Sequence, residues 1–148
     1  MTRRTLVVAA ALALIADQLS KLAVAHWLEA GERVEVVGPL TLYRTQNTGV
    51  AFSLFTGSGT ALAIVAAAAL LALIVVLPRY GPARRPGPLG MGLIIGGALG
   101  NLVDRFRLGH VVDFIDLPHW PAFNVADSCI TVGVVLVLLA AVRRPVRT

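Results

Sequence analysis

The sequence predicts an all-α integral membrane protein with four transmembrane helices and a small extracytoplasmic β-sheet or loop cradle. The first observation is composition, because 57% of the 148 residues are hydrophobic, only 14% are charged and the mean hydropathy is +0.79. Soluble domains carry about 25% charged residues, so a bilayer is the simplest solvent for such a chain. The second observation is four apolar stretches of near-membrane length, and the third is the clustering of arginines between them.

The apolar stretches set the expected helices. A bilayer core about 30 Å thick needs roughly 20 apolar helical residues. This length predicts spans over about residues 5–27, 60–77, 89–107 and 124–142, in a single membrane-embedded domain over residues 1–148. Arg3 and Arg4 before an apolar run are also typical of a cleavable signal sequence, but apolar residues continue past Asp17 and favour a retained helix. Glycines at positions 92, 96 and 100 predict close helix packing in the third span.

Charge distribution predicts the orientation of these helices. Arginines precede the first span, lie between the second and third, and follow the fourth, whereas acidic residues lie in the other connections. Cytoplasmic loops carry the excess of basic residues, so we expect both termini to be cytoplasmic. The same short basic clusters fit membrane lipid headgroups and argue against binding of nucleic acid.

The first external connection is expected to contain short strands. Alternating stretches at 33–37, 40–44 and 49–55 are each bounded by glycine or proline, which predicts three strands lying on the outer membrane surface. The stretch 47–55, with Gly49 and Gly57 as flexible points, is the candidate for a loop that closes over a site.

Acidic residues inside or beside the spans are the candidates for function, because a charge in the membrane is costly. They are Asp17, Asp104, Asp113 and Asp127. Structural alternatives remain open for two of them. Asp17 lies one helical turn before Lys21, which predicts a salt bridge. Asp127 lies three residues after Asn124 at an expected helix start, which predicts a capping box.

The neighbouring residues indicate the surroundings of the polar side chains between positions 101 and 116. Asn101, Asp104 and Arg105 predict an interfacial polar network. The apolar residues on both sides of Asp113 are expected to carry it back toward the bilayer, with no local partner. Asp116 is interpreted as a solvated loop acid, because Pro118 and Pro121 favour irregular, exposed structure.

Asp113 and Asp127 together suggest acid–base chemistry. Two carboxylates close together in a water-poor site share one proton, so one can activate water while the other polarises a peptide carbonyl. The histidines lack metal-ligand spacing, and Cys129 lies in an apolar stretch that is expected to be core. Intramembrane acids also mark ion pathways, so a small transporter or proton-coupled channel is one alternative and a non-catalytic assembly factor is another.

Five motifs in one order resemble those of lipoprotein signal peptidase, also called signal peptidase II. They are Asp17-Gln18 with Lys21, NTGVAF at 47–52, GNLVDR at 100–105, GHVVDF at 109–114 and FNVAD at 123–127. The resemblance runs from residue 17 to residue 127, nearly the whole chain.

The resemblance implies an intramembrane aspartic endopeptidase of the bacterial inner membrane that removes the signal peptide from diacylglyceryl-modified prolipoproteins. Cleavage on the N-terminal side of the lipidated cysteine, near the outer face, is implied to use Asp113 and Asp127 and no metal or other cofactor. We expect a monomer. The supporting positions implied by the motifs are Asn47, Asn101, Arg105, Asn124, Asp17 and Asp104.

Overall fold

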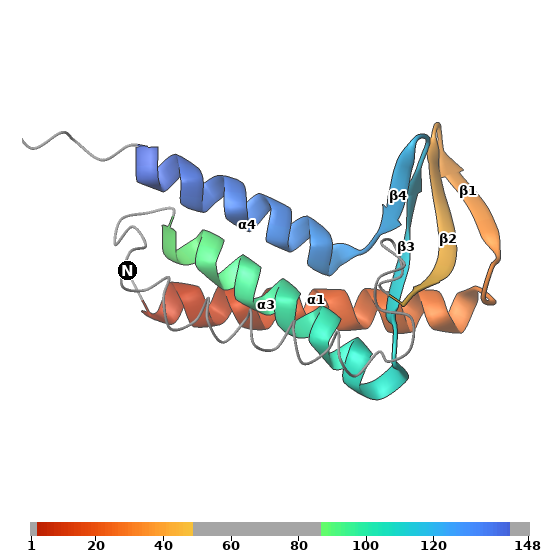
Figure 1. Cartoon of the computed structure of the whole chain (residues 1–148), viewed down its shortest axis with the longest axis horizontal. Coiled ribbons are helices and arrows are strands. Elements are labelled where there is room, and N and C mark those ends of the chain that lie inside the picture. The colour runs from red at the N-terminus through yellow and green to blue at the C-terminus, as the bar shows by residue number, and fades with distance from the viewer. Residues whose placement is uncertain (1–2, 49–86, 143–148) are drawn as a thin grey trace, which may run out of the picture.

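The computed structural model describes residues 3–48 and 87–142. Three helices run side by side, and a sheet stands at one end of them (Figure 1). The helices are α1 (Arg3–Trp27), α3 (Gly87–Leu108) and α4 (Val125–Val142). The strands are β1 (Arg33–Val37), β2 (Leu40–Asn47), β3 (Val111–Leu117) and β4 (Trp120–Phe123).

The predicted all-α fold with four membrane helices is wrong. The described residues combine helices with a four-stranded antiparallel sheet in the order β1-β2-β3-β4. Within these residues, α1 alone is long and apolar enough to cross a membrane by length and composition. The apolar part of α4, Val125–Ala140, is shorter, and glycines with the polar residues Asn101 and Asp104 lower the hydropathy of α3. The predicted span at 60–77, the strand at 49–55 and most of the candidate closing loop lie outside the described residues.

The sheet is larger than the sequence indicated. β1 coincides with the strand predicted at 33–37, and β2 contains the one predicted at 40–44 but continues to Asn47. β3 and β4 were not predicted. The residues around Asp113, which the sequence interpreted as a segment returning toward the bilayer, form β3, which pairs with β2 through Thr45 and Asp113. Apolar flanks are equally typical of a strand buried on both faces, which explains why this strand was missed.

Small residues bring the helices into close contact. A Cβ on Gly92 or Gly96 would overlap the backbone carbonyl of an α1 residue, Leu6 or Ala10 respectively. Gly97 has the same relation to the carbonyl of Ala126 in α4. The predicted packing role of the glycine stripe is confirmed, because only glycine lets the backbones approach this closely.

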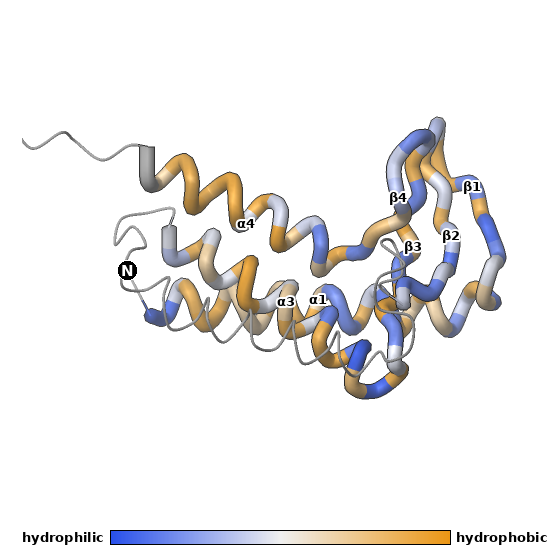
Figure 2. The backbone as a smooth tube through the Cα atoms, viewed as in Figure 1, coloured by the Kyte–Doolittle hydropathy of each residue, from blue (hydrophilic) through white to orange (hydrophobic). Residues whose placement is uncertain are grey.

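The helices join the sheet through a small apolar core. Val24 and Leu28 at the end of α1 pack with Phe114 of β3, and all three are buried. Along the rest of the bundle, many large apolar side chains face outward, such as Leu12 and Leu19 of α1 and Leu138 of α4. Figure 2 shows that polar residues gather instead where the helices meet the sheet. A lipid solvent accounts for an outward apolar surface of this extent.

Candidate active site

Polar side chains, most of them buried or half-buried, converge where the three helices meet the sheet. The cluster draws residues from every element except β1 and β4: Asp17, Gln18 and Lys21 of α1, Asn101, Asp104 and Arg105 of α3, Asn47 of β2, Asp113 of β3, and Asn124 and Asp127 at the start of α4. All eight positions proposed from the sequence lie in it. Asp17 and Asn124 are 0% exposed, which is rare for such residues unless every polar atom is satisfied.

Asp113 is held by two amide side chains. Its Oδ2 accepts a hydrogen bond from Asn47 Nδ2 at 2.9 Å, and its Oδ1 accepts one from Asn124 Nδ2 at 2.7 Å. The side chain is buried, with 2% of the residue exposed. Burial raises the pKa of Asp113 above its ordinary value, and the nearby charge of Asp127 adds to the shift. The bonds from the two asparagines and the charge of Lys21 oppose it.

Asp127 occupies the third position of α4 and takes part in its cap. The Asp127 N–H donates to Asn124 Oδ1 at 2.9 Å, and the Asn124 N–H donates back to Asp127 Oδ2 at 3.2 Å. The predicted capping-box arrangement is therefore confirmed. The other carboxylate oxygen, Oδ1, accepts a hydrogen bond from Asn101 Nδ2 at 2.8 Å. Asp127 is partly exposed, so it serves the helix cap and still faces open space.

The asparagine amides have fixed directions. Asn101 Oδ1 accepts from both Lys21 Nζ at 2.9 Å and Asn124 Nδ2 at 3.1 Å, so its amide nitrogen must point to Asp127. Asn124 Oδ1 accepts from the Asp127 N–H, so its amide nitrogen must point to Asp113. Asp113 and Asp127 therefore each accept a hydrogen bond from an asparagine amide whose orientation is fixed by its other contacts.

Lys21 lies at the centre of a second charged group behind these asparagines. Its Nζ is 2.9 Å from Asp17 Oδ2 and 2.8 Å from Asp104 Oδ2, and all three side chains are at most 5% exposed. The predicted Asp17–Lys21 salt bridge is confirmed. Asp104 was expected to share a network with Arg105, but its cation is Lys21 of another helix.

Two cavities open on the two carboxylates. A cavity of about 410 Å³, lined mostly by polar residues but of mixed surface character, lies over the sheet beside Tyr43, Thr45, Asn47 and Asp113. A second cavity, of about 470 Å³ and mainly apolar, lies between β4 and α4 and is lined by Trp120, Phe123, Thr131, Val132 and Asp127. The cavity beside Asp127 is thus the more apolar of the two. This arrangement suits a substrate with one apolar end and one polar end.

Residues 9–143 match the sequence profile of signal peptidase (SPase) II. The chain belongs to the signal peptidase II family. It is 39% identical over 138 residues to the lipoprotein signal peptidase of Dehalococcoides mccartyi strain 195, covering 89% of this chain and 85% of that protein. It is 42% identical over 146 residues to that of Paraburkholderia phytofirmans, covering 91% and 83%.

A solved structure described as a bacterial membrane enzyme has the same fold. It superposes with a TM-score of 0.80 at 31% sequence identity, over 94% of this chain and 93% of its own. A second, described in the same way, gives a TM-score of 0.78 at 29% identity, over 97% and 94%. Membership of the signal peptidase II family makes this chain a peptidase, and the resemblance stated from its motifs is confirmed. The transporter and assembly-factor alternatives are set aside.

The environment predicted for Asp116 of this signal peptidase II chain is wrong. Asp116 does not lie in a solvated loop, because it belongs to β3 and pairs with Arg33 of β1 at 2.8 Å. The Arg33 guanidinium also lies 3.9 Å from the centre of the Tyr43 ring. Of the two prolines that suggested a loop, Pro118 lies in the short turn between β3 and β4, and Pro121 lies within β4.

Two further contacts complete the cluster, and the one between helices had no local signal in the sequence. Gln18 Nε2 donates to Asp104 Oδ1 at 3.0 Å across the α1–α3 contact. Arg105 Nη1 donates to the carbonyl of Asn101 at 3.2 Å, while its Nε is buried and has no hydrogen-bond partner in the part of the chain that the structure describes. A buried donor of this kind is costly unless a ligand completes it.

Proposed function

We propose that this chain is an intramembrane aspartic endopeptidase that cleaves signal peptides from diacylglyceryl-modified prolipoproteins, on the N-terminal side of the lipidated cysteine. The observation that carries the proposal is the pair Asp113 and Asp127, each fixed by an oriented asparagine amide and each open to one of two cavities that differ in polarity. The names of the relatives support the substrate class, since they are lipoprotein signal peptidases.

The two carboxylates differ in ways that suit different roles. Burial favours the neutral form of Asp113, whose pKa is raised. Asp127 lies in the first turn of α4, a position that favours acidic side chains, and it accepts the Asn124 N–H. In the proposed reaction, Asp127 takes a proton from a water molecule as its oxygen attacks the scissile carbonyl carbon, while Asp113 donates a proton to the carbonyl oxygen.

Collapse of the tetrahedral intermediate completes the reaction. The carbon–nitrogen bond breaks, the proton held by Asp127 passes to the leaving amine, and the hydroxyl proton of the intermediate returns to Asp113. The products are a signal peptide with a new carboxylate and a lipoprotein whose first residue is the lipidated cysteine. Arg105, with its unpaired buried Nε, offers a donor to a substrate carbonyl oxygen near the reacting bond.

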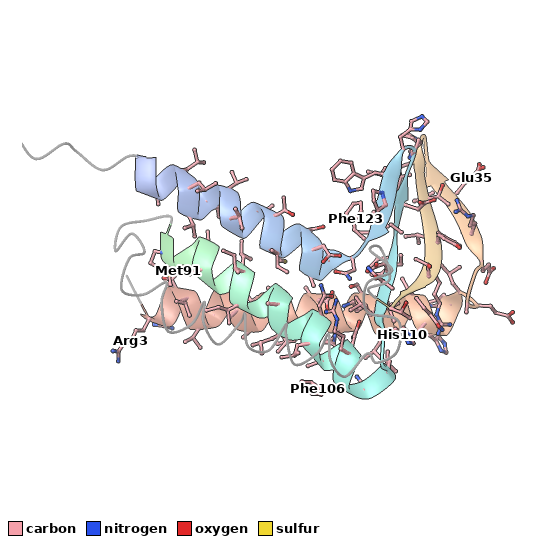
Figure 3. All side chains as sticks on the ribbon, viewed as in Figure 1. Arg3, Glu35, Met91, Phe106, His110 and Phe123 are labelled. Carbon is pink, nitrogen blue, oxygen red and sulfur yellow. The ribbon has the colours of Figure 1, made fainter. Side chains whose placement is uncertain are left out.

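The two cavities suggest how the substrate lies. The apolar groove between β4 and α4 fits the apolar signal peptide arriving laterally from the bilayer, and the more polar cavity over the sheet fits the chain that follows the cleavage site. Arg3 lies at the end of the bundle away from the sheet (Figure 3). We propose that both termini are cytoplasmic and that the site therefore lies near the outer face of the bacterial inner membrane. We further propose that the enzyme acts as a monomer.

The test is cleavage of a diacylglyceryl-modified prolipoprotein by the purified protein in detergent, followed by gel shift. We expect wild type and Asp116→Asn to cleave with a chelator present. Asp113→Asn and Asp127→Asn should fold and fail to cleave, because asparagine keeps the shape and removes the titrating group. A wild-type protein that leaves the lipidated substrate intact would overturn the proposed function, and a fully active Asp113→Asn would overturn the choice of dyad.

A further inference from the structure

Asp17 and Asp104 each hold the backbone immediately before one residue of the proposed catalytic dyad, Asp113 and Asp127. Asp17 Oδ1 accepts the N–H of Ala126 at 2.9 Å, and Ala126 precedes Asp127. Asp104 Oδ2 accepts the N–H of Val112 at 3.1 Å, and Val112 precedes Asp113. One acid therefore fixes the start of α4 and the other fixes β3. Both contacts are buried.

Lys21 joins these two acids into one unit. Its Nζ contacts Asp17 Oδ2 at 2.9 Å and Asp104 Oδ2 at 2.8 Å, and its third donor goes to Asn101 Oδ1 at 2.9 Å. The ammonium has three protons and three acceptors, so none is spare. We call Asp17, Lys21 and Asp104 the acid–lysine bridge. It connects the backbone at residue 126 to the backbone at residue 112 through buried charged contacts alone.

We propose that the acid–lysine bridge consists of positioning residues that fix the separation of the Asp113 and Asp127 carboxylates. The inference rests on the proposed function, because that function makes the two carboxylates a dyad. Within the part of the chain that the structure describes, neither Asp17 nor Asp104 forms a hydrogen bond or ion pair with a dyad side chain, so they act through the backbone. Two carboxylates share one proton only at short range, and a displacement of about 1 Å can cost about 100-fold in rate.

A purely stabilising bridge predicts a different result from a positioning bridge. Loss of stability alone lowers the fraction of folded enzyme and leaves the pH profile of that fraction unchanged. A wider dyad weakens the coupling between its carboxylates, so the two apparent pKa values of the pair move closer together. Among the described residues, the other charged groups near the dyad are Arg105 of α3 and Asp116 of β3. Neither is substituted in the variants below, because a change in their charge would itself move the pH profile.

The experiment uses variants matched in charge. Asp17→Asn/Lys21→Met and Asp104→Asn/Lys21→Met each remove one negative and one positive charge, so the net charge of the bridge is unchanged while its link is broken. We measure kcat and KM against pH for the purified full-length protein with lipidated prolipoprotein. Infrared titration of the carboxyl groups, assigned with Asp113→Asn, follows the dyad without any substrate. Met91→Ala is the control, because Met91 is an uncharged buried side chain at the end of the bundle away from the sheet and the bridge (Figure 3).

We expect both double variants to lose about 10- to 100-fold in kcat with little change in KM, and the limbs of the pH profile to approach each other. Met91→Ala should melt at a lower temperature and keep wild-type limbs. If a double variant does not fold, Asp104→Asn is the milder variant, and it is expected to move the limbs in the same direction. Unchanged kcat and limbs in a folded bridge variant, or limbs moved equally by Met91→Ala, would overturn the proposal. An inactive wild type would instead contradict the proposed function, and the infrared titration would still decide the coupling.

Discussion

Asn124 and Asp127 cap the start of α4 reciprocally, with the Asp127 N–H on Asn124 Oδ1 at 2.9 Å and the Asn124 N–H on Asp127 Oδ2 at 3.2 Å. The same Asn124 side chain donates to Asp113 Oδ1 at 2.7 Å. One residue therefore follows strand β4 directly, begins a helix and spans the two carboxylates proposed to be catalytic. Stability and activity at this position should be separable, because capping and bridging use different atoms.

Asn124→Ala should lower both stability and activity, whereas Asn124→Ser should restore only stability. Alanine removes the cap, at a cost of about 0.5–2 kcal/mol in the free energy of unfolding. Serine caps well but is too short to reach Asp113, so we expect stability to recover while cleavage stays about 100-fold below wild type. Thermal melting in detergent and the gel-shift assay measure the two. Full activity in Asn124→Ser would mean that the bond to Asp113 is dispensable.

The raised pKa of Asp113 predicts how stability depends on pH. Between the ordinary value of 3.8 and the raised folded-state value, the folded protein retains a proton that the unfolded chain has lost. Stability contributed by this group therefore falls as the pH rises through that window and stays low above it. Melting temperatures of wild type and Asp113→Asn, measured across this range, should change in favour of the variant as the pH increases. A difference in melting temperature between the two proteins that stays constant with pH would contradict the predicted fall in stability.

Asn47→Ala should move the basic limb of the activity profile to higher pH. The hydrogen bond from Asn47 favours the ionised form of Asp113 and lowers its pKa, so its removal leaves the effects of burial and of Asp127 less opposed. The measurement is kcat/KM as a function of pH. Glu35→Gln is a suitable control, since Glu35 is exposed on β1 of the same sheet and should leave the limb in place. Movement of the limb to lower pH would show that the hydrogen bond acts in the opposite sense.

Gly100→Ala should damage the site through Asp17. A Cβ at position 100 would collide with Asp17 Oδ2, the oxygen that pairs with Lys21. We expect a loss of about 1–3 kcal/mol in the free energy of unfolding and a fall in activity. The test is a double-mutant cycle with Asp17→Ala, which removes the colliding carboxylate. The two effects should be strongly non-additive, and simple additivity would place the damage elsewhere.

Asp116→Asn should be close to neutral. Its ion pair with Arg33 lies at the surface, with 57% of the Arg33 side chain exposed, and such pairs contribute about 0–1 kcal/mol. Melting temperature and cleavage rate should both stay near the wild-type values. A loss of cleavage comparable to that of Asp113→Asn would make Asp116 a member of the reacting group, since it also lines the cavity over the sheet.

Local patterns predicted the local parts of this protein. Spacing of one helical turn was sufficient for the Asp17–Lys21 pair, and a separation of three residues was sufficient for the Asn124–Asp127 cap. Hydropathy located α1, α3 and α4 to within two residues at each end of the predicted spans. It failed for β3, because an apolar flank around Asp113 does not distinguish a membrane segment from a buried strand.

By itself, the sequence determined an apolar helical chain with short strands, named the acids that meet in the polar cluster, and indicated the family to which the chain belongs. Only the tertiary structure decided that Asp113 lies in a central strand and that Lys21 pairs with Asp104. It also decided that Asp17 reaches the N–H of Ala126, 109 residues away along the chain. Periodicity and spacing report the surroundings of one segment. Contacts between α1, α3 and α4 depend instead on how closely their backbones approach, and that distance is set by glycines whose partners lie on other helices.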